Sequence, residues 1–257
     1  MIVSSTCSVS LNLHNTRYKF GKVSDIQQLS QVYPTPATTD WPRLSRQNGM
    51  TSSHFHTPAE IRAAAMAVGN ALAQFETYAL VGGSACVVLG STRATQDIDL
   101  VVPRGETSDA RQLLRASPDF EVEARTNHTT YKARSPVQVE ILTPPLLFKE
   151  PFDENTEVIT IEGVKVLKPA LLLNAKCGSI TGRSTEDKRR TDSLDINFLL
   201  NFCAQNPEYL PESDEVPRAT KQLVHVLIQL YGGEEAWVRA GFSLRTGIDY
   251  LESLTES

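Results

Sequence analysis

The chain has 257 residues, which is enough for one large domain or two small ones. Its hydrophobic content of 40% and charged content of 21% are typical of a soluble globular protein, and no apolar run reaches the ~20 residues that a membrane helix needs, so no membrane partner is expected. The net charge of −5 argues against a broad nucleic-acid-binding surface, because such a surface is basic.

Residues 1–56 are predicted to form an irregular N-terminal extension. They contain no Glu, are rich in Ser, Thr, Asn and Gln, and carry Pro34, Pro36 and Pro42, which interrupt any periodic pattern. Their acid-poor, Ser-rich, basic start has some features of an organelle transit peptide, and Met50 could serve as an alternative start. No amphipathic helix is evident, however, and no cysteines form a Cys-x-x-Cys pair. We therefore expect a cytoplasmic protein without disulfides or structural zinc.

An α/β core is predicted for residues 57–168. It begins with a capping box, Thr57-Pro58-Ala59-Glu60, followed by apolar residues at helical spacing. The expected strands cover residues 78–81, 97–102, 120–124, 129–133, 137–142, 157–161 and 164–167, and further helices are expected over residues 84–89 and 108–115. This order predicts an α+β fold with a mixed β-sheet and packed helices.

A C-terminal helical region is predicted for residues 169–257. Ser184 can cap a helix, whose buried stripe is expected to consist of Leu194, Phe198 and Phe202. Another amphipathic helix is expected over residues 221–231, ending at two glycines. The sheet core is thus predicted to be followed by packed helices.

The segment from Tyr78 to Ser84 carries the first functional signal. Short, β-prone apolar residues run into Gly82-Gly83, and an apolar helix pattern follows. Glycine lets a phosphate approach closely, and the free N–H groups and dipole at a helix start favour anions. No Lys-Ser or Lys-Thr follows, so the segment is not a P-loop. Gly82, Gly83 and the Ser84 hydroxyl are therefore predicted to bind phosphate.

Three carboxylates carry the second signal. Strand side chains alternate between faces, so Asp97 and Asp99 are expected to point the same way. Glu140, in the strand over residues 137–142, is the best third acid. Such an oxygen-rich set suits one or two Mg²⁺ ions. Asp97, Asp99 and Glu140 are therefore the predicted metal ligands and catalytic residues. Glu140 is assigned to the metal that activates the attacking hydroxyl and is also a candidate acceptor of its proton.

The run Val81-Gly82-Gly83-Ser84, followed by these three acids, resembles the DNA polymerase β-like nucleotidyltransferase superfamily. The finer pattern, Gly82-Gly83-Ser84-Ala85 with Arg93-Ala94-Thr95-Gln96-Asp97-Ile98-Asp99-Leu100, is most similar to AbiEii-type toxins and related minimal nucleotidyltransferases. The resemblance implies a nucleotidyltransferase-like sheet in residues 57–168, with ATP or another NTP as substrate and Mg²⁺ as cofactor. It does not name the acceptor.

Two downstream helices extend the resemblance. The first is similar to the family's helix with a triphosphate-contacting lysine, which implies that Lys176 binds the nucleotide. The second implies a nucleotide-binding role for Asp192. The structural alternatives are a solvated helix lysine at Lys176 and an ion pair between Asp192 and Lys188, which are four residues apart. Arg93 and Thr95 are expected to position the carboxylates by hydrogen bonding.

The predicted function is transfer of an NMP from an NTP to a hydroxyl acceptor, with release of pyrophosphate. The acceptor is expected to be an RNA end, such as that of tRNA, or a protein side chain, and a masking protein partner is a further expectation. Two alternatives stay open: nucleotidylation of a small hydroxylated molecule, as in antibiotic-modifying relatives, and a non-catalytic nucleotide-binding module. The histidines, including His56 in the extension, are expected to have surface or core roles.

Overall fold

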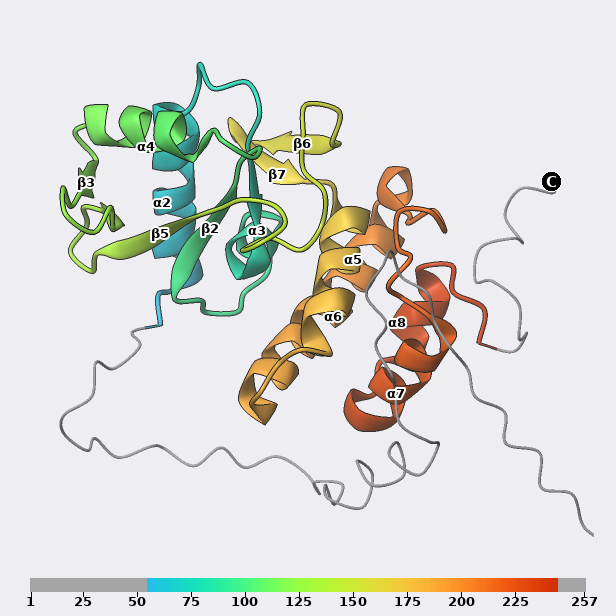
Figure 1. Ribbon diagram of the computed structural model, residues 1–257. Coiled ribbons are helices and arrows are strands. Elements are labelled where there is room, and N and C mark those ends of the chain that lie inside the picture. Colours follow the sequence, from blue (N-terminus) through green and yellow to red (C-terminus); the bar gives the residue numbers. More distant parts are fainter. Residues whose placement is uncertain (1–54, 245–257) are drawn as a thin grey trace, which may run out of the picture. The chain divides into compact units, whose positions relative to one another are not determined.

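The computed structural model describes residues 55–244, so the predictions for residues 1–54, including the transit-peptide features and Met50, lie outside the described residues. Within that range a seven-stranded mixed sheet has the order β3-β4-β5-β2-β1-β7-β6 (Figure 1). The strands are β1 (Ala79–Val81), β2 (Asp97–Val101), β3 (Phe120–Val122), β4 (Thr129–Tyr131), β5 (Val137–Leu142), β6 (Val158–Ile161) and β7 (Val164–Leu167). The helices are α2 (Pro58–Ala71), α3 (Gly82–Val88), α4 (Thr107–Ala116), α5 (Pro169–Ile180), α6 (Glu186–Gln205), the 3-10 turn η1 (Pro207–Tyr209), α7 (Lys221–Tyr231) and α8 (Glu234–Arg239). The predicted fold, a mixed sheet with packed helices, is confirmed.

Strand β2 lies at the centre of the sheet. It pairs antiparallel with β1 and parallel with β5, where Asp99 stands opposite Glu140. Residues opposite each other on paired strands share a face, so Glu140 lies on the same face as Asp97 and Asp99. The other face of β2 carries Ile98 and Leu100, which are fully buried, and helices α2 and α3 both contact this strand. The sheet therefore separates an apolar core from a polar face.

Helix α2 and the β6–β7 hairpin follow local sequence signals. The Thr57 hydroxyl accepts a hydrogen bond from the Glu60 N–H at 3.3 Å, and the Glu60 carboxylate accepts one from the Thr57 N–H at 2.8 Å, which completes the predicted capping box. In the hairpin, Glu162 and Gly163 have positive φ values of 51° and 83°, as a two-residue type I′ turn requires. Both features depend only on residues close together in the chain.

His56 belongs to the packed structure and not to an irregular extension. It is only 3% exposed, and its N–H donates to the Thr95 carbonyl at 2.7 Å in an isolated β-bridge. Its Nδ1 lies 3.3 Å from the Ser135 hydroxyl. Both partners are distant in sequence, so no local pattern indicates this contact. The prediction that places His56 in the extension is wrong.

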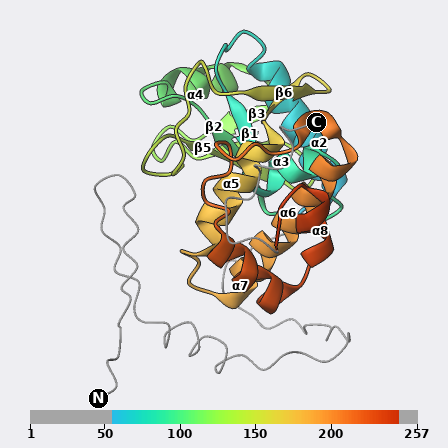
Figure 2. The ribbon, with the colours of Figure 1, turned by 90° about the vertical axis from the view of Figure 1, so that its right-hand side faces the viewer.

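Helices α5 to α8 form the helical region within the described residues. Helix α5 packs along α6, which also contacts α7 and α8, and Figures 1 and 2 show these four helices gathered beside the sheet. Helix α7 ends at Gly232 as predicted, whereas the short helix α8 was not expected from the sequence. Within residues 55–244 no helix has both the length and the apolar character required to cross a membrane.

Helix α6 buries a different face from the predicted one. Its N-cap is Thr185 and not Ser184. Leu194 is 53% exposed, and Phe198 and Phe202 are only half-buried, so the predicted stripe is wrong. The residues that α6 buries are Asp192, Asp195, Ile196, Leu199, Leu200 and Cys203. The helix turns this way because its two buried acids pair with cations from other elements.

Candidate functional site

The turn after β1 allows a carboxylate to pack directly against the backbone. Gly82 begins α3 with a φ of 65°, a left-handed conformation that other residues rarely adopt. A Cβ atom on Gly82 would lie 2.0 Å from Oδ2 of Asp99, and one on Gly83 would lie 2.5 Å from Nη2 of Arg93. Both glycines are therefore required for close contacts with β2 and with the loop before it.

Ser84 joins this turn to the carboxylate strand. It is fully buried, and its hydroxyl donates to the Val81 carbonyl at 3.0 Å and accepts from the Asp99 N–H at 3.1 Å. Because the hydroxyl donates one hydrogen bond and accepts another within the protein, it holds the backbone of Asp99 in place. The phosphate-binding role of Gly82, Gly83 and Ser84 stays a prediction, and it depends on the backbone N–H groups of the turn.

Asp97, Asp99 and Glu140 come together as expected from strand alternation. Each offers one carboxylate oxygen, and the three oxygens lie within 4.8 Å of one another. Asp97 and Asp99 are half-buried, whereas Glu140 is exposed. The group forms because β2 and β5 are parallel neighbours in register. A ligand can therefore approach the carboxylates from the side of Glu140.

The electrostatics of these carboxylates favour a bound cation. Burial, followed by the negative charges of Asp97 and Glu140, raises the pKa of Asp99 to about 7. Burial also raises the pKa of Asp97, although the positive charges of Lys176 and Arg93 oppose the effect. Three like charges at this separation repel one another, and an all-oxygen donor set suits a hard divalent cation. The three residues therefore fit a divalent metal ion.

A line of alternating charges adjoins the carboxylates. Lys176 on α5 is 7% exposed and pairs with Asp192 at 2.9 Å and with Asp195 at 2.7 Å. Arg93 pairs with Asp195 at 2.8 Å, and Arg183 pairs with Asp192 at 2.6 Å. We call Arg93, Asp195, Lys176, Asp192 and Arg183 the charge chain. Its three cations and two carboxylates leave it net positive, opposite in sign to the metal-site carboxylates.

Lys176 and Asp192, two neighbouring members of the charge chain, are both ionised at neutral pH. Burial by itself lowers the pKa of Lys176. The negative charges of Asp195 and Asp192 outweigh this effect and bring the pKa well above its ordinary value. Burial likewise raises the pKa of Asp192, but the hydrogen bond from Arg183 and the charge of Lys176 lower it overall. Lys176 is thus not a solvated lysine, and the expected pair between Asp192 and Lys188 is wrong, because other cations hold Asp192. The nucleotide-binding roles of Lys176 and Asp192 stay predictions.

Arg93 does not hydrogen-bond to the metal-site carboxylates as expected. Its Nε and Nη2 donate to the two oxygens of Asp195 at 2.8 and 2.9 Å, and its Nη1 donates to the Ala94 carbonyl at 2.8 Å. It acts on Asp97 only through its charge, which lowers the pKa of that carboxyl. Thr95 is buried against Gly83. Arg93 therefore ties the loop before β2 to helix α6.

His56 is a neighbour of the site that the sequence patterns missed. Its charge is one of those that lower the pKa of Asp97, after Lys176 and Arg93. The bridge to Thr95 places it there. A single bridge between distant segments leaves no periodic signal in the sequence, so only the folded structure reveals it.

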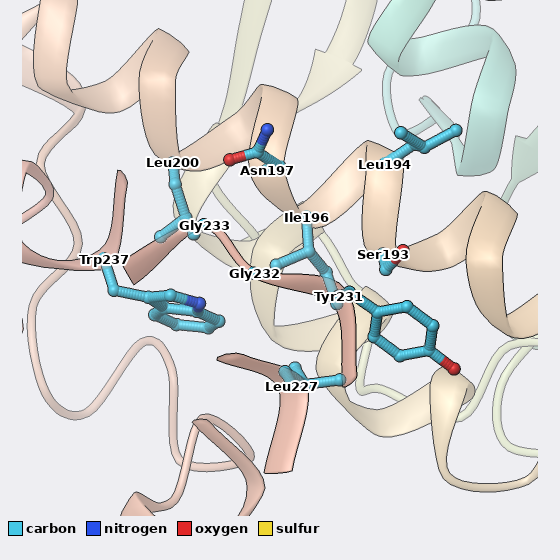
Figure 3. Close-up of a pocket in the computed structure, with 10 residues that line it drawn as sticks. All are labelled: Ser193, Leu194, Ile196, Asn197, Leu200, Leu227, Tyr231, Gly232, Gly233 and Trp237. Carbon is cyan, nitrogen blue, oxygen red and sulfur yellow. The ribbon is translucent and has the colours of Figure 1, made fainter. Parts of the chain in front are cut away.

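Two hollows adjoin helix α6. One is a cavity of about 60 Å³ between α6, α7 and α8, and Figure 3 shows Asn197, Tyr231 and Trp237 among the side chains around it. The other is a groove of about 300 Å³ between α6 and the loop before β2, and Arg93 and Asp195 line part of it. The groove adjoins the charge chain, whereas none of the predicted site residues lines the cavity.

The fold is shared with proteins of known structure. No family model matches the chain, and the comparison with curated proteins finds no match. The structure is similar to that of an antigenic nucleotidyltransferase-like protein from Paracoccidioides brasiliensis, with 25% identity and a TM-score of 0.53 over 73% of this chain and 94% of that one. The fold is nucleotidyltransferase-like. A weaker likeness, with 18% identity and a TM-score of 0.47 over 71% of this chain and 90% of the other, links it to JHP933 from Helicobacter pylori. The closer relationship to AbiEii-type proteins is not confirmed.

Proposed function

We propose that the protein is a divalent-metal-dependent nucleotidyltransferase that moves an NMP from an NTP to a hydroxyl acceptor and releases pyrophosphate. The observation that carries the proposal is the convergence of Asp97, Asp99 and Glu140 within 4.8 Å, with Asp99 packed on the Gly82 turn. The nucleotidyltransferase-like fold supports it. The fold alone would not suffice, because one fold can host many functions.

The protein's own groups have separate roles in this reaction. The acceptor oxygen attacks the α-phosphorus, the bond from that phosphorus to the bridging oxygen breaks, and pyrophosphate leaves. Glu140 is exposed and can take the acceptor proton. The backbone N–H groups at the start of α3 favour the anionic phosphates. Asp97, Asp99 and Glu140 would hold the divalent ion, such as Mg²⁺, which when bound neutralises phosphate charge and activates the acceptor oxygen.

The proposed acceptor is an RNA end or a protein side chain, although the resemblance to nucleotidyltransferases does not itself name the acceptor. Incubation of the protein with each α-labelled NTP and Mg²⁺, in the presence of total RNA, cell protein or a metabolite extract, identifies the acceptor class from the pool that gains label. Label on RNA or protein is the expected result, whereas label on a metabolite indicates the small-molecule alternative.

Matched variants test the role of the carboxylates. Asp97→Asn is expected to abolish transfer, because it removes one charge from the metal site. Asp119→Asn, an exposed acid before β3, serves as the control and is expected to transfer at the wild-type rate. Full transfer by Asp97→Asn would refute the metal assignment. NTP binding without label in any pool would favour a non-catalytic binding module.

A further inference from the structure

The three cations of the charge chain differ in their freedom to meet a ligand. Lys176 is 7% exposed, and two carboxylates hold its ammonium group. The Arg93 side chain is 19% exposed, and all three of its guanidinium nitrogens donate hydrogen bonds to Asp195 or Ala94. The Arg183 side chain is 38% exposed, and its Nη1 makes no hydrogen bond to any residue between 55 and 244. Arg183 is therefore the most exposed of these cations, and its Nη1 is the one side-chain nitrogen among them that makes no hydrogen bond to the described residues.

Asp192 holds Arg183 in a defined direction. Nε of Arg183 lies 2.6 Å from Oδ2 of Asp192, and Nη2 lies 3.3 Å from Oδ1. The same carboxylate accepts from Nζ of Lys176 at 2.9 Å and from Oγ of Ser179 at 3.0 Å. Since each oxygen of Asp192 already accepts two hydrogen bonds, Asp192 acts as an anchor. A guanidinium held along one edge is a preorganised donor for phosphate oxygens on the other.

The charge chain joins Arg183 to the glycine turn beside the metal-site carboxylates. Asp192 links Arg183 to Lys176, and Asp195 links Lys176 to Arg93. Nη2 of Arg93 in turn lies against Gly83, 2.5 Å from where a Cβ atom on that glycine would be. Lys188 and Arg190 are exposed cations close to Arg183 in the sequence, but they form no ion pair with the charge chain in the described part of the molecule. Of these three cations, Arg183 is therefore the one that contacts connect to the metal-site side of the molecule.

We propose that Arg183 binds the β- or γ-phosphate of the nucleotide through Nη1, with Asp192 and Lys176 as its positioning residues. The inference rests on the proposed function, because the β- and γ-phosphates leave as pyrophosphate in that reaction. It adds to the phosphate contact implied for Lys176, whose ammonium group is held between two carboxylates.

Inorganic tripolyphosphate with Mg²⁺ is a probe that depends on neither base nor acceptor. We expect isothermal titration calorimetry on the full chain to show about tenfold weaker binding to Arg183→Gln, as the loss of a charge-assisted contact predicts. The KM for NTP is expected to rise by a similar factor, with a smaller change in kcat. Arg183→Lys keeps the charge but loses the bidentate anchor, so its loss should be intermediate. Arg190→Gln removes an exposed charge nearby and should bind as the wild type does.

The outcomes separate this inference from the proposed function. If the wild type binds tripolyphosphate and transfers nucleotide, but folded Arg183→Gln binds within about twofold of it, the Arg183 assignment is wrong and the proposed function stands. If the wild type binds neither tripolyphosphate nor any NTP, both fail. Circular dichroism checks the fold of each variant, and if Arg183→Gln does not fold, the same criterion applies to Arg183→Lys.

Discussion

Asp99 is the residue on which the contacts of the candidate site converge. Its N–H donates to Ser84, its Oδ2 packs on Gly82, and Glu140 stands opposite it on β5. Burial and the neighbouring carboxylates raise its pKa to about 7. A single side chain thus links the glycine turn, the metal site and the pH dependence of the protein.

The raised pKa of Asp99 makes the stability of the metal-free protein depend on pH. Between about pH 4 and pH 7 the folded protein holds a proton on Asp99 that the unfolded chain has lost, so this residue's contribution to the free energy of unfolding falls as the pH rises through that window. In EDTA, Asp99→Asn is therefore expected to melt roughly 2–8 °C above the wild type at pH 8, with a smaller difference at pH 5. Thermal melts check this, and adding Mg²⁺ at pH 8 should raise the melting temperature of the wild type only. Identical pH profiles for the two proteins would contradict the assignment.

Gly82→Ala is expected to impair the metal site as well as the fold. The new Cβ would lie 2.0 Å from Oδ2 of Asp99, and the φ of 65° adds a backbone cost of about 1–2 kcal/mol. The control is Gly105→Ala, which has a φ of 99° but nothing within 4 Å of the added atom. Both variants should melt at lower temperature, but only Gly82→Ala should bind Mn²⁺ more weakly by electron paramagnetic resonance. Equal Mn²⁺ affinities would show that the contact with Asp99 is unimportant.

At the level of elements, helix α6 shows how charge can decide which face of a helix is buried. The apolar stripe predicted for it leaves Leu194 53% exposed, while Asp192 and Asp195 are each 1% exposed. Acids of this kind can be buried because each pairs with cations from other elements. The helix is therefore oriented by its ion pairs together with the aliphatic residues beside them.

Leu199→Ala and Leu194→Ala distinguish the two faces of α6. Leu199 is fully buried, so its truncation should lower the free energy of unfolding by about 2–5 kcal/mol. Leu194 is largely exposed, so its truncation should change that free energy by no more than about 0.5 kcal/mol. Urea denaturation measures both. A larger loss for Leu194→Ala than for Leu199→Ala would mean that the helix is turned to the predicted face.

On the scale of the whole described molecule, the charge chain joins the sheet core to the helical region. Arg93 precedes β2, and Asp195 lies 102 positions further along the chain on α6. Lys176 on α5 completes the link by pairing with both acids of α6. The same ion pairs therefore connect elements and set the charge around the metal site.

Asp195→Asn is expected to weaken this connection. In the wild type, the Asp195 carboxylate lies 2.8 Å from Arg93 and 2.7 Å from Lys176, and the change removes its negative charge. Breaking such a buried ion pair lowers the free energy of unfolding by about 3–5 kcal/mol. The control, Glu235→Gln, removes an exposed pair with Arg239 at 3.9 Å, which is worth about 0–1 kcal/mol. Urea denaturation compares the two variants. A loss for Asp195→Asn no larger than that for the control would mean that the charge chain does not stabilise the fold.

Much of the fold and part of the candidate site were predictable from the sequence. The capping box at Thr57, the strands and the spacing of Asp97 and Asp99 are local features. Each forms where it was predicted, although five of the seven strands are one or two residues shorter than expected. The position of Glu140 beside them required a correct guess of which strand pairs with β2. The partners of Arg93 and Asp192 and the burial of His56 were not predictable, because they depend on contacts between distant segments.

The sequence by itself determined which residues alternate along β2 and where the glycines interrupt the chain, because the two-residue period of a strand and the conformational freedom of glycine are local properties. Tertiary structure alone decided that β5 lies beside β2, that the Ser84 hydroxyl forms its hydrogen bonds within the protein, and which cation pairs with which acid. Coulomb interactions and packing depend on distances in space, and those distances exist only once the sheet and the helices have come together.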